Sequence, residues 1–174
     1  MSDNIDQLYL SYRAEEDRLL LRIITVHGVE VHLWLTRRFV QALWESLREF
    51  VESDRHVVSQ REPQARAAVL AFQHEQALAE SKFTKHKKSN EIDTRMARDT
   101  PLLAAELKVE ERAADLRRLR FAERGGASVL IAVNLRLAHS LCKLLRDSVA
   151  TADWGLELSL TDEAVALAAG HGPN

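Results

Sequence analysis

Apolar and polar residues alternate over residues 29–35, and the spacing then changes to that of a helix. A period of two is typical of a strand with one buried face, whereas apolar residues three and four apart mark an amphipathic helix. The change of pattern falls at Thr36. These residues therefore predict a strand that leads directly into a helix. The apolar side of that helix holds Phe39, Leu43, Leu47, Phe50 and Val51.

The same succession returns in the second half of the chain. Residues 129–133 alternate again, and Asn134 stands where Thr36 stands in the first half. The helix that follows repeats the earlier apolar positions, so that Leu141 comes 98 positions after Leu43. The repeated strand-and-helix pattern predicts a duplicated unit. The apolar positions of the second helix are Leu137, Leu141, Leu145 and Val149.

Two further strands precede the helix in each half. Glycine at Gly28, and again at Gly125 and Gly126, marks the hairpin turns, since glycine tolerates the positive φ of tight turns. A register slip of one residue would turn each apolar set to the wrong face. In the first half the sets are Leu8, Leu10 and Tyr12, then Leu19, Leu21 and Ile23. In the second half they are Ala105, Leu107 and Val109, at an offset of 97 positions, then Leu119 and Phe121.

The predicted fold is α+β, a tandem duplication of an antiparallel three-stranded meander followed by a helix. The first unit covers residues 1–52, a helical and partly mobile insertion covers residues 53–101, and the second unit covers residues 102–174. We expect the units to share one core as a single domain, because one helix does not cover three strands.

Three smaller elements complete this prediction. Alanine, glutamine and glutamate favour a helix over residues 64–81 that begins near Pro63. Gly155 fits the C-cap of the last helix. Residues 156–160 alternate and predict a short final strand, with residues 57–58 as its counterpart in the first half.

Composition narrows the class of protein. The 174 residues are 46% hydrophobic and 29% charged, with a formal net charge of −2, so bulk charge does not favour polyanions. Cys142 is the only cysteine, which excludes an intrachain disulfide, and we expect its thiol to be buried. No apolar run approaches the ~20 residues that span a bilayer. The first residues are also too polar for a signal peptide, so we expect a cytoplasmic protein.

No residue pattern indicates an enzyme, a cofactor or a metal. On a helix, His74 and Glu75 face different directions, so they do not form a pair of metal ligands. Ser140 lies beside His139, but neighbours on a helix do not face each other as a nucleophile and its base must. We therefore expect no catalytic, cofactor-binding or metal residues, and we place His139 on the surface of its helix.

The outward face of the first sheet is the leading candidate surface. It presents aromatic, cationic and apolar side chains if the apolar parity points inward. A contiguous apolar patch usually marks an interface, whereas aromatic and cationic residues together can stack bases and neutralise phosphates. Coverage by the middle helix is a further possibility. The residues of this face are Tyr9, Arg13, Arg18, Leu20, Arg22, Ile24, His32 and Trp34.

A basic segment follows the predicted middle helix. A solvated loop is its simplest interpretation, and contact with an acidic partner or with phosphates is the alternative, which salt would weaken. Membrane binding is not favoured, since no basic amphipathic helix adjoins the segment. Its residues are Lys82, Lys85, His86, Lys87 and Lys88.

We predict a non-enzymatic protein–protein interaction or assembly module, self-associating as a homo-oligomer through the outer face or an edge of the first sheet. Burial of the apolar residues would drive this contact. The alternative is a single-stranded nucleic-acid binding protein that uses the same face and residues 82–88. Its candidate residues on the face are Tyr9, Arg18, Arg22 and Trp34.

Overall fold

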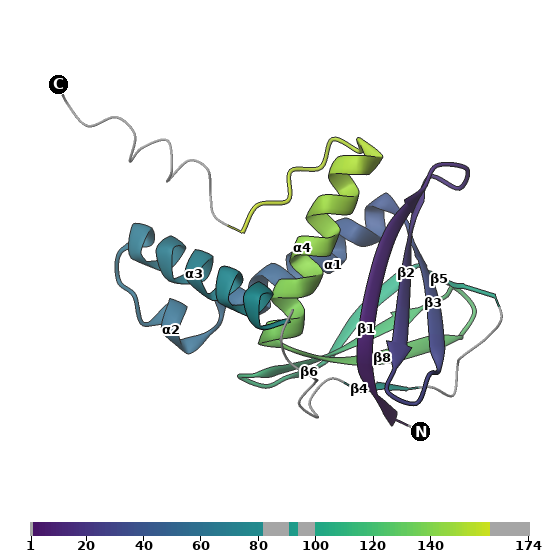
Figure 1. Cartoon of the computed structure of the whole chain (residues 1–174), viewed down its shortest axis with the longest axis horizontal. Helices are drawn as coiled ribbons and strands as arrows, with labels where there is room; N and C mark the ends of the chain where they lie inside the picture. Colours follow the sequence, from purple (N-terminus) through teal and green to yellow (C-terminus); the bar gives the residue numbers. More distant parts are fainter. Residues whose placement is uncertain (1, 82–90, 94–99, 161–174) are drawn as a thin grey trace.

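A computed structural model describes residues 2–81, 91–93 and 100–160 of the chain and has a mixed α+β architecture (Figure 1). The strands are β1 (Ser2–Arg13), β2 (Arg18–Thr25), β3 (Glu30–Leu35), β4 (Glu91–Asp93), β5 (Leu102–Ala104), β6 (Glu106–Arg112), β7 (Leu116–Ala122) and β8 (Ser128–Asn134). The helices are α1 (Arg37–Glu52), α2 (Arg55–Val58), α3 (Pro63–Ser81) and α4 (Leu135–Ala152).

The described strands form one eight-stranded sheet in the order β5-β3-β2-β1-β4-β8-β7-β6. Antiparallel pairing joins β1, β2 and β3, and it also joins β6, β7 and β8, so the expected meanders are present. Strand β4 lies between β1 and β8 and links the two meanders. The two meanders are seen at different inclinations in Figure 1.

The strands at the two ends of the sheet, β5 and β6, are neighbours in the sequence. Strand β5 pairs in parallel with β3, and only Ala105 separates it from β6 at the opposite end of the order. The Ala105 backbone N–H donates to the carbonyl of Ala122 in β7 at 2.8 Å. One continuous stretch of chain therefore hydrogen-bonds with both meanders.

Side-chain caps begin the two long helices where the apolar pattern changes. Thr36 Oγ1 accepts a hydrogen bond from the Phe39 N–H at 3.2 Å, and Asn134 Oδ1 accepts one from the Leu137 N–H at 2.9 Å. Each cap satisfies one backbone donor that the first helical turn leaves unpaired. The predicted helix starts are confirmed.

Each long helix packs against the meander of the opposite half. Helix α1 contacts β6, α4 contacts β1, and the two helices contact each other. They lie on the same side of the strands in Figure 1. Their buried apolar residues belong to one cluster with the inward-facing residues of both meanders. Residues of both halves thus build the hydrophobic core.

The ladder of β6 corrects the expected offset. Leu107 lies opposite Phe121, as Leu8 lies opposite Ile23, so the first strands correspond at 99 positions and not 97. Ala105 is exposed and stands outside the buried set. A bulge between Val109 and Glu111 shifts the register further, and such an extra residue does not show in the apolar pattern.

Two other expected elements are wrong. Residues 57–58 belong to the helical turn α2, and residues 156–160 form no strand, although Leu158 and Leu160 are buried. Leucines that alternate can pack against a core without any backbone pairing, so periodicity alone does not predict a ladder. Strands β4 and β5 were not expected, because each has only three residues.

Candidate functional site

The strand register places the predicted residues in rows on one face of β1, β2 and β3. Leu20 lies beside Trp34, and Trp34 lies beside Leu103 of β5, which makes an apolar row across three strands. Tyr9, Arg22 and His32 form the adjoining row. The residues of opposite parity, Leu19, Leu21, Ile23, Val31, Leu33 and Leu35, are buried in the core.

Side chains within this face contact one another. The Arg22 guanidinium lies 4.7 Å from the centroid of the Tyr9 ring, a cation–π arrangement, and Tyr9 remains 46% exposed. His32 Nε2 lies 3.0 Å from Glu30 Oε2. The remaining predicted residues of β2 and β3, namely Arg18, Leu20, Ile24 and Trp34, are half-buried.

No helix of the described part of the chain covers this face. Helices α1 and α4 pack on the inner side of the strands, and α3 packs on α4 and α2 (Figure 1). The possibility that the middle helix covers the outer face is therefore wrong. Helix α3 instead buries Leu70, His74 and Ala77, which follow one another at helical spacing.

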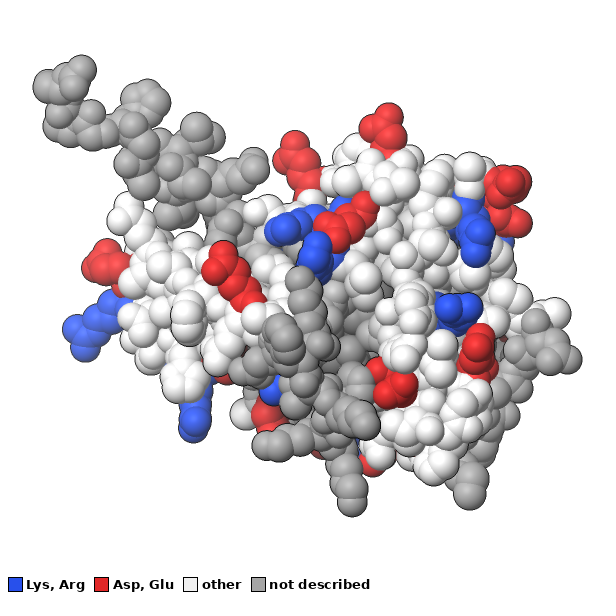
Figure 2. Space-filling view, in the orientation of Figure 1, with Lys and Arg blue, Asp and Glu red and all other residues white. Residues whose placement is uncertain are grey.

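The two meanders differ in how their outward arginines are neutralised. Arg118 pairs with Glu111 at 2.7 Å, and Arg120 pairs with Glu110, whose pKa this hydrogen bond lowers. Among ion pairs between described residues, Arg13, Arg18 and Arg22 of the first meander take no part. Lysines, arginines and carboxylates are interspersed on the surface visible in Figure 2, with no extended area of one sign.

Helix α4 also contacts the backbone of the first meander. The Ser148 hydroxyl of α4 donates to the Leu10 carbonyl of β1 at 3.4 Å. The ends of the sheet join through Ala105, as described above.

A buried pair of histidines joins α3 to α4. His74 Nδ1 and His139 Nδ1 are 3.3 Å apart, with one imidazole donating and the other accepting. Burial and the neighbouring His74 lower the pKa of His139 to about 4, while burial and the nearby Arg146 lower that of His74. The expected surface position of His139 is wrong, because only 4% of it is exposed. Both rings lie within the apolar stripes of their helices, and this spacing in the sequence could have predicted that they are buried.

These histidines do not assemble a metal centre with their neighbours. Within the described ranges, no three residues among His, Cys, Asp and Glu are placed to hold a metal ion. Cys142 is buried as expected, and burial raises the pKa of its thiol to about 12. A thiol with that pKa is almost entirely protonated at neutral pH and is a poor nucleophile.

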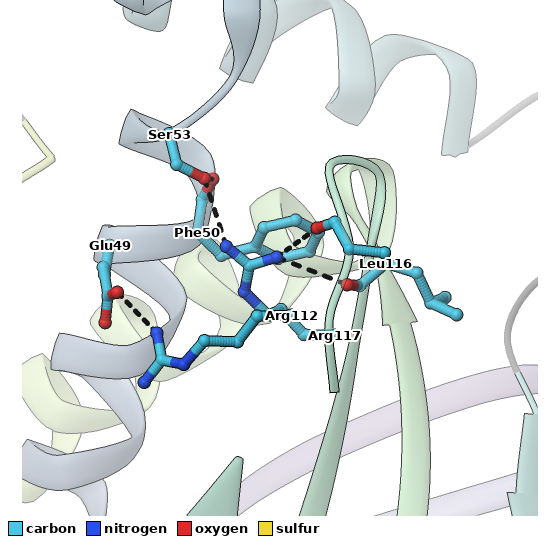
Figure 3. Close-up of polar contacts among 7 residues, drawn as sticks. Glu49, Phe50, Ser53, Arg112, Leu116 and Arg117 are labelled. Carbon is cyan, nitrogen blue, oxygen red and sulfur yellow. Dashed lines mark hydrogen bonds and ion pairs between the residues drawn. The ribbon is translucent and has the colours of Figure 1, made fainter. Parts of the chain in front are cut away.

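A second buried polar contact, which the sequence pattern did not reveal, clamps α1 to the β6–β7 hairpin (Figure 3). Arg117 is 7% exposed, and its guanidinium lies 4.4 Å from the centroid of the Phe50 ring. It donates to the carbonyls of Ala113 and Leu116 and to Ser53 Oγ. Arg112 and Glu49 form an ion pair beside this clamp. The contact is structural, since Arg117 occupies an inward position 98 residues after the buried Leu19.

Comparison of the chain with protein-family models, with curated proteins and with solved structures gives no match. Among the described helices, none is long and apolar enough to cross a membrane. The basic segment, with Lys82, Lys85, Lys87 and Lys88, lies outside the described residues.

Proposed function

We propose that this protein is a non-enzymatic interaction module that self-associates through the outer face of β1, β2 and β3. The observation that carries the proposal is the apolar row of Leu20, Trp34 and Leu103, which no described helix covers. Half-buried aromatic and aliphatic side chains at the centre of a polar rim are typical of protein interfaces. A cytoplasmic location is part of this proposal, and the buried thiol of Cys142 is compatible with a reducing compartment.

The charges on the face suit contact between two copies. In a two-fold dimer the same patch meets itself, so every cation must find an acceptor that the patch also carries. Arg18 and Arg22 lack carboxylate partners among the described residues, whereas Glu30 lies on the same face at its edge. Arginines of one copy facing Glu30 of the other would set the register, while burial of Trp34 would supply most of the affinity.

We also infer that the two halves derive from one duplicated unit. This is supported by the matching order of three antiparallel strands and a helix, and by side-chain caps at Thr36 and Asn134. Each helix also packs against the opposite meander, α1 on β6 and α4 on β1, although α4 additionally contacts β8 and α3. Their outer faces nevertheless differ, because among described residues Arg118 and Arg120 of the second meander form ion pairs, whereas Arg18 and Arg22 of the first do not.

Measurement of molecular mass in solution over a concentration series tests self-association. We expect the parent protein to dimerise at high concentration and Trp34→Ala to remain a monomer. Phe72→Ala is the matched control, because Phe72 is a 65% exposed aromatic residue on α3, remote from the proposed interface. The parent dimer should persist in moderate salt, since burial of apolar surface supplies most of its affinity. A parent protein that stays monomeric, or a Trp34→Ala variant that still dimerises, refutes the proposal.

Single-stranded nucleic-acid binding is the second candidate function. Arg18, which forms no ion pair with another described residue, and the stacked Arg22 and Tyr9 favour it, because a base can stack on an aromatic ring while a guanidinium contacts phosphate. The basic segment of residues 82–88 would add electrostatic attraction. The mildly acidic whole chain weighs against this candidate.

A labelled oligonucleotide distinguishes the two candidates. Nucleic-acid binding predicts an affinity that falls steeply with salt and is lost in the Arg18→Ala, Arg22→Ala double variant. The Arg118→Ala, Arg120→Ala double variant is the control, since it removes the same charge from the opposite meander. Equal binding by the parent and the first double variant would exclude this function.

A further inference from the structure

A cavity of about 560 Å³ lies where β3 passes into α1, at the margin of the hydrophobic core. One wall comes from the first turns of α1, and the other comes from the β5–β6 junction and the residues that follow β7. Its volume lies within the range of natural small-molecule sites. It is lined by Thr36, Arg38, Phe39, Ala42, Leu103, Ala104, Ala105, Leu107, Glu123 and Arg124.

The lining combines an apolar floor with cations at the rim. Phe39, Ala104 and Leu107 are buried or half-buried, whereas Arg38 and Arg124 are exposed. Neither arginine takes part in an ion pair between described residues. Glu123 is the single carboxylate of the lining, and its Oε1 accepts the Leu103 N–H at 3.1 Å. Two guanidiniums against one carboxylate leave the cavity with an excess of positive charge.

We propose that this cavity binds a small amphipathic anion, in which a carboxylate or sulfonate head is joined to an aromatic or short aliphatic body. The body would lie against Phe39, Ala104 and Leu107, where it removes apolar surface from water. The head would meet Arg38 and Arg124, because a guanidinium donates paired hydrogen bonds to planar oxyanions. A polymer does not suit a cavity of this size, so the occupant is a small molecule.

Titration with 8-anilinonaphthalene-1-sulfonate, an aromatic sulfonate that fluoresces in apolar surroundings, tests the proposal. N-phenyl-1-naphthylamine has the same ring system without the charge and is the matched neutral probe. We expect the sulfonate to bind with a one-to-one stoichiometry and at least about tenfold more tightly than the amine, since hydrogen bonds to a charged group contribute that much. Backbone amide shifts of Leu103 and Ala104 on addition of benzoate should locate the site.

Three sets of variants separate this cavity from other surfaces. The Arg38→Gln, Arg124→Gln double variant should weaken sulfonate binding about tenfold or more. The Arg55→Gln, Arg61→Gln variant loses the same charge from exposed positions in and beside α2 and should bind as the parent does. Leu20→Ala, which removes an apolar residue of the proposed interface that does not line the cavity, should also bind normally, so failure of this proposal is distinguishable from failure of self-association.

Ala42 provides a test that does not depend on the arginine variants folding. It is an exposed residue of α1 that lines the cavity, and both glutamate and glutamine are compatible with a helix surface. Ala42→Glu should abolish sulfonate binding by charge repulsion, while the isosteric Ala42→Gln should retain it. The proposal is overturned if the neutral amine binds as tightly as the sulfonate. It is equally overturned if Ala42→Glu binds like Ala42→Gln, or if the parent does not bind the sulfonate.

Discussion

The indole N–H of Trp154, directly after α4, donates a 2.7 Å hydrogen bond to Asp17 Oδ1 in the turn between β1 and β2. Tyr12 donates to the same carboxylate oxygen at 2.9 Å, and its ring meets the Trp154 ring edge-on. In the other half, Arg117 joins the β6–β7 hairpin to the end of α1. A polar contact therefore fastens the end of each long helix to the hairpin turn of the opposite meander, although the residue types differ.

Replacing Trp154 with Phe tests the first of these contacts. The variant keeps an aromatic ring but removes the indole donor, so we expect Tm to fall by about 3 °C. The hydrogen bonds from Trp154 and Tyr12 lower the pKa of Asp17, and the variant should raise that pKa toward its ordinary value. NMR titration of the Asp17 carboxyl measures the change. An unchanged pKa would show that the indole does not stabilise the carboxylate.

Arg117→Lys tests the clamp on α1. An ammonium group does not reproduce the planar fork that reaches two carbonyls and Ser53 while stacking on Phe50. We expect the free energy of unfolding to fall by about 2 kcal/mol, as when a buried hydrogen-bond network is broken. Arg118→Lys is the control, because Arg118 is an exposed neighbour whose substitution should change stability by less than ~0.5 kcal/mol. Urea denaturation measures both, and equal losses would contradict the clamp.

The histidine pair predicts a loss of stability in acid. The pKa of His139 is lowered to about 4 in the folded protein, whereas an imidazole in the unfolded chain titrates near ~6.5. Between these values the unfolded chain binds more protons, so stability decreases as pH falls through this window and levels off below pH ~4. The difference corresponds to about 3 kcal/mol, and the lowered pKa of His74 acts in the same direction.

Comparison with a double variant isolates this contribution. In His74→Leu, His139→Leu the interface between α3 and α4 stays apolar and has no imidazole to protonate. We expect its unfolding free energy, measured in urea from neutral pH to about pH 4, to fall by about 3 kcal/mol less than that of the parent. Parallel pH profiles for the two proteins would disprove the role of the pair.

The end of α4 offers a stabilising substitution. Helix α4 ends at Ala152, and its C-cap is Asp153 with a left-handed backbone at φ +52°, so the expected cap at Gly155 is wrong. Glycine adopts this conformation without the strain that a Cβ adds. Asp153→Gly should therefore raise the unfolding free energy. The net gain should be about 0.5 kcal/mol, because glycine also makes the unfolded chain more flexible and this offsets part of the relieved strain. Gly155→Ala, at φ +63°, should lower the unfolding free energy. Thermal denaturation should therefore show a higher Tm for Asp153→Gly and a lower Tm for Gly155→Ala.

The candidate face was accessible from the sequence because it depends on strand parity alone. Once Leu19, Leu21 and Ile23 point inward, Leu20 and Arg22 must point outward. The row that links Leu20 and Trp34 to Leu103 was not predictable. It requires the parallel pairing of β3 with β5, a strand of three residues that begins 67 positions after β3 ends.

By itself the sequence determined which face is apolar in the strands of the two meanders and in α1 and α4, and that these helices begin after Thr36 and Asn134. These features depend on residues within one or two turns of each other, so local periodicity and capping are enough to specify them. Tertiary structure decided that each long helix crosses to the opposite meander and that His74 meets His139. Such contacts join segments far apart in the chain, and they form because several apolar faces can be removed from water together only in this arrangement.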